Sequence, residues 1–394
     1  MATDMTSPFA NRHTRRAFLL LAGTLPAVKP FKPADFQPGS EPWKKIKRFF
    51  QTPPEFQDDF GDYRPVLQFE DGRVVRNAKE WESRRRELLK KWHDLLGPWP
   101  PLLEKPHAHE QFSESVGFTR RRIELQIAPG RKTAAYLLTP DGPGPFPAVI
   151  DVYYYPDDGA GIKSNRRFEN DFGYQLVQRG IAALCVGQNP TAPRPDADLY
   201  YPTWDKAQLQ PLSYLAYVAA NCHTFLSQRE EIDPSRIGIV GHSYGGKWAL
   251  FAGALYDKFA AVCVSDPGIV FDESRPNVNY WEPWYLGYVA GTEFRPRGVL
   301  TEAYPRVGPY KTMRERGDDL HELHALIAPR PFFVAGGSED PPERWRALNH
   351  AVAVNRLLGF KNRVGMSNRP AHKISPEANE QICLFFEHFL KQEH

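Results

Sequence analysis

Residues 236–250 read RIGIVGHSYGGKWAL, and this stretch decides the fold. Its first half is an apolar, β-branched run typical of a buried strand, and its second half has the composition of a helix. The five residues at the join, GHSYG at 241–245, fit the pattern G-x-S-x-G in the context that the pattern requires. Glycines on both sides permit a tight, strained turn that leaves the Ser243 hydroxyl exposed above the sheet. Ser243 is therefore predicted to be a nucleophile, with the backbone amide of Tyr244 directed at a developing oxyanion.

Strands and helices alternate on both sides of this turn. A β-hairpin that turns at Pro129-Gly130 and a buried strand, PAVIDVYYY (147–155), come before it. Further strands are predicted at 181–187, 236–241, 260–266, 330–337 and 363–366, and helices at 170–179, 211–229, 343–358, 376–391 and from Ser243 onward. Such alternation predicts an α/β fold: a mostly parallel twisted sheet with helices on both faces and reactive groups at the carboxyl ends of the strands.

A serine nucleophile needs a base and a carboxylate, and both follow in the chain. His372 lies in NRPAHKISPEANEQ, a short loop between the last predicted strand and the last helix. Asp340 follows strand 330–337, so we expect it to be the acid in the order Ser, Asp, His. Glu339 beside it and Asp266, which ends strand 260–266, are the alternative acids.

The chain has three predicted parts. Residues 1–28 contain Arg15-Arg16 ahead of a short apolar run and resemble a twin-arginine export signal, which implies an exported protein; the alternative is a basic leader on a cytoplasmic protein. Residues 29–105 are predicted to be an irregular extension with one amphipathic helix, 78–96. Residues 106–394 form the main domain, with an aromatic-rich insertion at about 268–323 as a lid. Apart from the short run near the N-terminus, no segment has the length of a stable membrane span.

Composition limits the classes of function. The formal net charge is +3 and charges of both signs are mixed along the chain, which gives no reason to expect a nucleic-acid partner. The cysteines lack metal-type spacing and fall in apolar segments, so we expect buried free thiols at positions 185, 222, 263 and 383; disulfides in an exported protein are the alternative. The proposed chemistry needs neither a metal nor a cofactor. The sequence says nothing of the oligomeric state.

From about Gly117 onward the chain resembles an α/β-hydrolase of the serine esterase type. The resemblance rests on DPSRIGIVGHSYGGKWAL, LIAPRPFFVAGGSEDP and AHKISPEANEQICLFFEHFL. Within the superfamily it is nearest to carbohydrate esterases of the acetylxylan and glucuronoyl groups and to dienelactone-hydrolase-like members, through Lys247, the NYWEPWY insertion and AVAVNRLLGF. It implies a nucleophile at Ser243, a base at His372, an acid at Asp340, and a second oxyanion donor from the backbone of Tyr154 or Tyr155.

The resemblance also implies a substrate: a small-molecule or carbohydrate ester. Flat aromatic rings suit the apolar faces of sugars, so Trp281 and Trp284 are expected to contact substrate together with Lys247, unless the aromatics form the insertion's own core. Glucuronoyl esterases carry an arginine directly after the nucleophile, where this chain has Tyr244, and this difference favours an acetylxylan-type ester. The alternatives are a prolyl-oligopeptidase-like serine peptidase and a catalytically silent carbohydrate-binding module.

Overall fold

The computed structural model describes residues 39–162, 170–188, 199–292 and 298–391. Asp35–His394 form one compact unit, described below. The other unit, Met1–Ala34, lies outside the described residues, and so does the predicted export signal.

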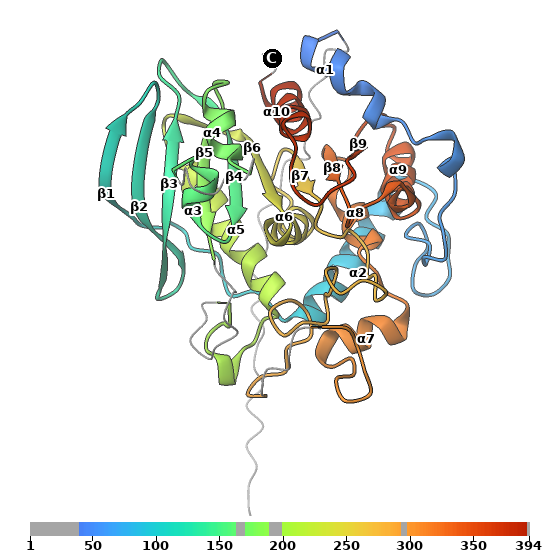
Figure 1. Ribbon diagram of the computed structural model, residues 1–394. Coiled ribbons are helices and arrows are strands. Elements are labelled where there is room, and N and C mark those ends of the chain that lie inside the picture. The colour runs from blue at the N-terminus through green and yellow to red at the C-terminus, as the bar shows by residue number, and fades with distance from the viewer. Residues whose placement is uncertain (1–38, 163–169, 189–198, 293–297, 392–394) are drawn as a thin grey trace, which may run out of the picture. The chain divides into compact units, whose positions relative to one another are not determined.

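A nine-stranded sheet runs through the unit, in the order β1-β2-β3-β5-β4-β6-β7-β8-β9 (Figure 1). The strands are β1 (Ala108–Ser115), β2 (Thr119–Ala128), β3 (Arg131–Thr139), β4 (Phe146–Tyr153), β5 (Ala182–Gly187), β6 (Ile232–His242), β7 (Val262–Ser265), β8 (Phe332–Gly336) and β9 (Val364–Asn368). From β1 to β5 the neighbours pair antiparallel, and from β5 to β9 they pair parallel. The carboxyl ends of β4 to β9 therefore meet at one edge, as the α/β prediction requires.

Helices cover both faces of the sheet, which confirms the predicted fold class. They are α1 (Glu41–Ile46), α2 (Ala78–Leu96), α3 (Pro156–Gly159), α4 (Phe172–Val177), α5 (Pro211–Ser227), α6 (Tyr244–Leu255), α7 (Gly308–Arg316), α8 (His321–Ile327), α9 (Trp345–Leu357) and α10 (Pro376–Leu390), with 3-10 helices η1 (Lys47–Phe50), η2 (Pro54–Phe56), η3 (Trp204–Lys206) and η4 (Pro342–Arg344).

Successive residues of the central strands enter two different cores. On β6, Ile239 belongs to the large cluster that includes α2, α5, α6, α8 and α9, whereas Val240 belongs to the cluster with α1, α4 and α10. On β8, Val334 and Phe333 divide in the same way. This period of two, with apolar residues on both faces, is expected of parallel strands that are covered on both sides.

The extension before the sheet packs on the same cores. Helix α2 has the predicted bounds, because Asn77 caps its first turn by accepting from Glu80 N and Gly97 ends it at φ 93°. A Cβ at Gly97 would lie 1.9 Å from Gln208 O, so only glycine fits there. Helix α1 lies beside α10 (Figure 1) and inserts Trp43 into their shared core.

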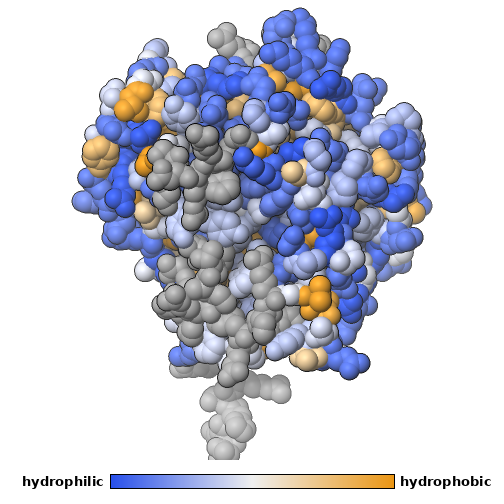
Figure 2. All heavy atoms as spheres, viewed as in Figure 1, coloured by the Kyte–Doolittle hydropathy of each residue, from blue (hydrophilic) through white to orange (hydrophobic). Residues whose placement is uncertain are grey.

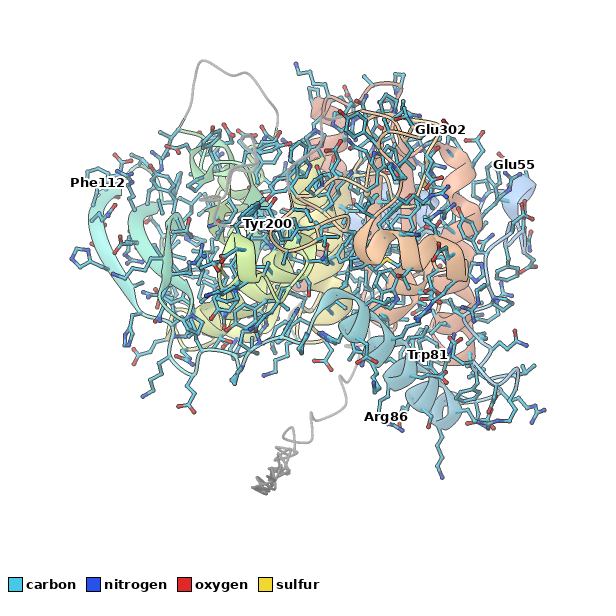
Figure 3. The ribbon with its side chains drawn as sticks, turned by 90° about the horizontal axis from the view of Figure 1, so that it is seen from below. Glu55, Trp81, Arg86, Phe112, Tyr200 and Glu302 are labelled. Carbon is cyan, nitrogen blue, oxygen red and sulfur yellow. The ribbon has the colours of Figure 1, made fainter. Side chains whose placement is uncertain are left out.

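Among the elements that were not predicted are β1, α1, α3, α7 and α8. Strand β1 is almost wholly exposed, and its sequence, AHEQFSES, lacks the alternation that marks a half-buried strand. It forms by pairing with β2 at the edge of the sheet, where Figure 3 places Phe112. Helix α1 has only six residues, which is too short for a helical period to show within the extension predicted to be irregular.

The four cysteines are buried and unpaired, as predicted. Within the described ranges, no helix has both the length and the apolar character needed to cross a membrane. On the face that Figure 2 shows, the surface is mostly hydrophilic and its apolar residues are scattered.

Candidate active site

The join between β6 and α6 has the strained geometry that the sequence predicts. Ser243 has φ 55° and ψ −114°, and it occupies the N-cap position of α6. A Cβ at Gly241 would lie 2.2 Å from Gly245 O, and a Cβ at Gly245 would lie 1.9 Å from Val152 O. Both glycines are therefore needed because strand β4, the turn and the helix approach one another so closely.

Ser243, His372 and Asp266 form a continuous chain of hydrogen bonds. Ser243 Oγ lies 2.8 Å from His372 Nε2, and His372 Nδ1 lies 2.7 Å from Asp266 Oδ2. The Asp266 side chain is fully buried, whereas the histidine side chain is 41% exposed. The His372 side chain is therefore accessible to solvent, and the Asp266 carboxylate behind it is shielded from water.

The preference for Asp340 as the acid is corrected by this geometry. Asp340 accepts from Ile269 N at 2.6 Å and Gly268 N at 2.9 Å, and it makes no hydrogen bond to His372. Asp266, one of the two alternatives, occupies the position beside the base. The other alternative, Glu339, pairs with Arg275 at 3.3 Å, away from the histidine.

Two loops hold the two aspartates by exchanging backbone amides. Asp266 Oδ1, at the end of β7, accepts from three amides of the loop after β8: Gly337 N at 2.6 Å, Glu339 N at 3.0 Å and Asp340 N at 2.9 Å. The Asp340 side chain in turn accepts from the loop after β7. Burial and the charge of Asp266 raise the pKa of Asp340 above its usual range, so Asp340 gives up its proton less readily.

Sequence reasoning missed three residues that brace the site. The Arg369 guanidinium donates to His372 O at 2.8 Å, to Ala335 O at 2.7 Å and to Ser265 Oγ at 3.2 Å, and it thereby fixes the histidine loop to the strand ends. Ser265 O accepts from Ser243 N at 2.8 Å. A signal for Arg369 was present, because the arginine stands three residues before the histidine in the same short loop.

The third missed residue, His242, lies beside the base. Its ring centroid is 4.7 Å from that of His372, and its Nδ1 lies 3.1 Å from Ser265 O. Burial, followed by the charges of His372 and Arg369, lowers the pKa of His242 well below its usual range. His242 is therefore neutral at physiological pH and donates from Nδ1, so it places no positive charge beside an imidazolium at His372.

The amides expected at the oxyanion lie around the same turn. Tyr244 N is at the first position of α6, with the positive end of the helix dipole behind it. The Tyr154 ring stacks on the Tyr244 ring, with centroids 4.7 Å apart. Tyr155 directly precedes α3. The loop after β4 thus borders the turn that carries Ser243, and a second donor from Tyr154 or Tyr155 stays a prediction.

The three predicted substrate contacts differ in exposure. Trp281 is 1% exposed and its Nε1 donates to Gly298 O at 2.9 Å, so it belongs to the interior of the insertion. Trp284 is half-buried and packs at the edge of the main core. Lys247 is buried one turn after the nucleophile, where Nζ donates to Pro267 O and lies 4.7 Å from the centroid of the Tyr280 ring. Of the two tryptophans, only Trp284 offers surface to a ligand without rearrangement.

No three His, Cys, Asp or Glu side chains among the described residues are grouped as a metal site would need. The chemistry available at the site is that of a serine hydroxyl, a histidine base and a buried carboxylate, joined in the order that acyl transfer uses. The sheet order and the strained serine turn define the α/β-hydrolase fold.

Comparison with known proteins gives the same class. Residues 219–346 match the prolyl oligopeptidase family, which shares this fold. The chain is 24% identical over 288 residues to a 4-O-methyl-glucuronoyl methylesterase of Podospora anserina, covering 68% of this chain and 53% of the relative, or about half of that protein's length. It is 24% identical over 344 residues to a 4-O-methyl-glucuronoyl methylesterase of Thermothelomyces thermophilus, covering 81% of this chain and 79% of the relative.

Solved structures agree. A glucuronoyl esterase from Solibacter usitatus superposes with a TM-score of 0.63 at 18% identity, covering 83% of this chain and 97% of that one. A putative acetyl xylan esterase from Bacteroides fragilis superposes with a TM-score of 0.54 at 16% identity, covering 78% of this chain and 79% of that one. The resemblance to carbohydrate esterases of the α/β-hydrolase superfamily, inferred from the sequence, is confirmed.

Proposed function

We propose that this chain is a serine carboxylic ester hydrolase that acts on a carbohydrate ester. The observation that carries the proposal is the hydrogen-bond chain from Ser243 through His372 to Asp266, with 2.8 Å and 2.7 Å between the paired atoms. These distances are in the range in which a base takes a proton from a serine and a carboxylate orients that base.

The reaction proceeds in two steps. His372 Nε2 takes the proton of Ser243 as Oγ bonds to the ester carbonyl carbon, and the resulting oxyanion is stabilised by the amide of Tyr244 and by one from Tyr154 or Tyr155. The C–O bond to the alcohol breaks, and the alcohol leaves with the proton from His372. Water then attacks the acyl-enzyme by the same route and releases the acid. Asp266 accepts from His372 Nδ1 and so holds the histidine in the tautomer with a proton on that nitrogen.

The substrate class follows from the relatives and from the side chains around the turn. Two curated relatives are named for the methyl ester of 4-O-methyl-glucuronic acid, so a uronic acid ester is the first substrate to test. An acetyl ester is the second, because Tyr244 follows the nucleophile and a putative acetyl xylan esterase shares the fold. Trp284 and Lys247 are the proposed substrate contacts. We also propose export of the protein through Arg15-Arg16.

The test is hydrolysis by the purified protein and by Ser243→Ala of four substrates: a short-chain aryl ester, a glucuronoyl methyl ester, acetylated xylan and a prolyl peptide amide. We expect serine-dependent cleavage of the aryl ester and of one of the two carbohydrate esters. Inactivity of the wild type on every ester would overturn the proposal.

A peptidase is the competing candidate, because the matching family is named for prolyl oligopeptidase. Faster cleavage of the peptide than of any ester would establish that alternative. Sugar binding without turnover by either protein would indicate a silent carbohydrate-binding module.

A further inference from the structure

A cavity lies away from Ser243. It has a volume of about 430 Å³ and is enclosed by segment 50–60 of the extension and by the end of α9, the turn after it and the start of β9. Because β9 runs parallel to β8, its first residue, Val364, lies at the amino edge of the sheet, opposite the edge that carries Ser243. In Figure 3, η2, which carries Glu55, lies at the edge of the molecule opposite Phe112 on β1.

The charged side chains of this cavity favour an anion. Arg356, Lys361 and Arg363 line it, and among the described residues of its lining Asp58 is the one carboxylate. Asp58 Oδ1 pairs with Arg356 Nη1 at 3.2 Å, which leaves the lining with an excess of positive charge. The Arg363 guanidinium lies 5.3 Å from the centroid of the Phe360 ring and is held among the cavity walls.

A buried amide in the wall calls for a hydrogen-bond donor from the ligand. Asn355 is 3% exposed; its Nδ2 donates to Ala351 O at 2.8 Å, and its Oδ1 has no hydrogen-bond partner. The neighbouring Asn349 differs, since its amide donates to Phe56 O and Asp59 O at 2.7 Å each and its Oδ1 accepts from Thr52 at 3.3 Å. A buried acceptor without a donor costs free energy that a hydroxyl group would recover.

Apolar rings complete the lining. Phe50, Phe60 and Phe360 face the cavity together with the polar groups. Aromatic surface beside a few convergent polar groups is typical of sites for small molecules with one apolar face. Inorganic phosphate carries a hydroxyl donor but no apolar face to pack against such rings, whereas a sugar acid has both an apolar ring face and hydroxyl donors.

We propose that this cavity binds a uronic acid, as the free sugar acid or as a residue of an oligosaccharide. The carboxylate lies toward Lys361 and Arg363, a hydroxyl donates to Asn355 Oδ1, and one face of the ring packs against Phe60. The binding is independent of turnover at Ser243, so it holds whatever ester the catalytic site cleaves.

The test is a calorimetric titration with the catalytic site blocked. Ser243 is first modified with an aryl phosphonofluoridate, so that binding at the nucleophile does not contribute to the heat. D-glucuronate and a glucuronic-acid-substituted xylo-oligosaccharide are the two ligand arms, and D-glucose and inorganic phosphate are the controls. We expect saturable binding of glucuronate, weaker binding of glucose by tenfold or more, and no competition by phosphate at equal concentration. If the oligosaccharide binds with higher affinity than free glucuronate, the ligand is a residue of the polymer. If the two affinities are equal, the ligand is the free sugar acid.

Variants locate the binding. Lys361→Glu reverses an exposed charge in the cavity and should weaken glucuronate binding about tenfold, whereas Lys132→Glu, an equally exposed reversal on β3, should leave it unchanged. Asn355→Leu removes the acceptor and should weaken the binding of both glucuronate and the oligosaccharide about fivefold. If this variant fails to fold, the comparison of Lys361→Glu with Lys132→Glu still tests the proposal. Absence of saturable heat, equal loss in both lysine variants, or displacement by phosphate would each overturn the proposal.

Discussion

Asp266→Asn tests the assignment of the acid. The Asp266 carboxylate accepts three backbone N–H groups on Oδ1 and the imidazole Nδ1 on Oδ2. An asparagine must keep its carbonyl oxygen on the three amides, because its NH2 group would otherwise face three donors. Its NH2 then faces His372 Nδ1, which becomes an acceptor only if the proton moves to Nε2. In that tautomer His372 cannot take the proton of Ser243.

The expected effect is a loss of about 10⁴-fold in kcat, or about 5 kcal/mol of transition-state stabilisation. Asp340→Asn is the matched control, since it is an equally buried carboxylate whose partners are the amides of Gly268 and Ile269. It should reduce kcat by no more than about tenfold, the effect of one lost hydrogen bond of about 1 kcal/mol.

The assay is steady-state hydrolysis of an aryl ester, with far-ultraviolet circular dichroism to show that each variant is folded. Burst titration of Ser243 gives the active fraction. The assignment of the acid would be refuted if folded Asp266→Asn retained a tenth of wild-type kcat. It would also be refuted if Asp340→Asn lowered kcat as much as Asp266→Asn.

Three other predictions concern stability. Gly245→Ala should prevent folding or activity, because its Cβ would lie 1.9 Å from the Val152 carbonyl oxygen on β4. Gly246→Ala is the control, since its Cβ would lie 3.0 Å from the Pro267 side chain and the variant should retain measurable activity. Soluble yield and aryl ester hydrolysis are measured for both variants. Arg330→Met should lower the free energy of unfolding in urea by about 3–5 kcal/mol without changing kcat, because the buried guanidinium donates to five carbonyls at the ends of α6 and α8. The control is Arg346→Met, which removes an exposed ion pair and should lower the free energy of unfolding by less than about 1 kcal/mol. Burial raises the pKa of Asp151 from 3.8 to about 8, so its contribution to stability is fully present only below about pH 4 and is lost as the pH rises from there through 8. Asp151→Asn should therefore raise the melting temperature most at pH 9, by roughly half as much at pH 6 and little at pH 4, and an equal effect at all three would contradict the assignment.

Local signals predicted much of the fold. Helix α2 was placed residue for residue, because an asparagine cap and a glycine with positive φ mark its two ends. The sequence singled out Ser243 and His372 because each lies in a short segment directly after a predicted strand, and the structure brings their side chains to 2.8 Å from each other. Strand β1 was missed, since its pairing with β2 makes it a strand even though its own composition does not.

The acid was harder to predict because two aspartates end adjacent strands. Asp266 and Asp340 both follow a buried apolar run, and their order along the chain favoured Asp340. The acid is the carboxylate that the loop conformations direct toward His372. Asp266 has φ 50°, a backbone conformation that its local sequence does not predict. The sequence left two roles open for Trp281, and its burial favours a place in the insertion's own core, which depends on how the insertion folds back on itself.

The exchange of amides between the loops after β7 and β8 has a mechanical consequence. Gly268 and Ile269, which hold Asp340, are also the first residues of the aromatic insertion. A force applied to the insertion is transmitted through them to Asp340, whose own backbone N–H holds the acid behind the base. Two successive hydrogen bonds thus connect the insertion, which carries the proposed sugar contact Trp284, to Asp266 beside His372. A movement of the insertion on sugar binding would therefore be felt at the acid.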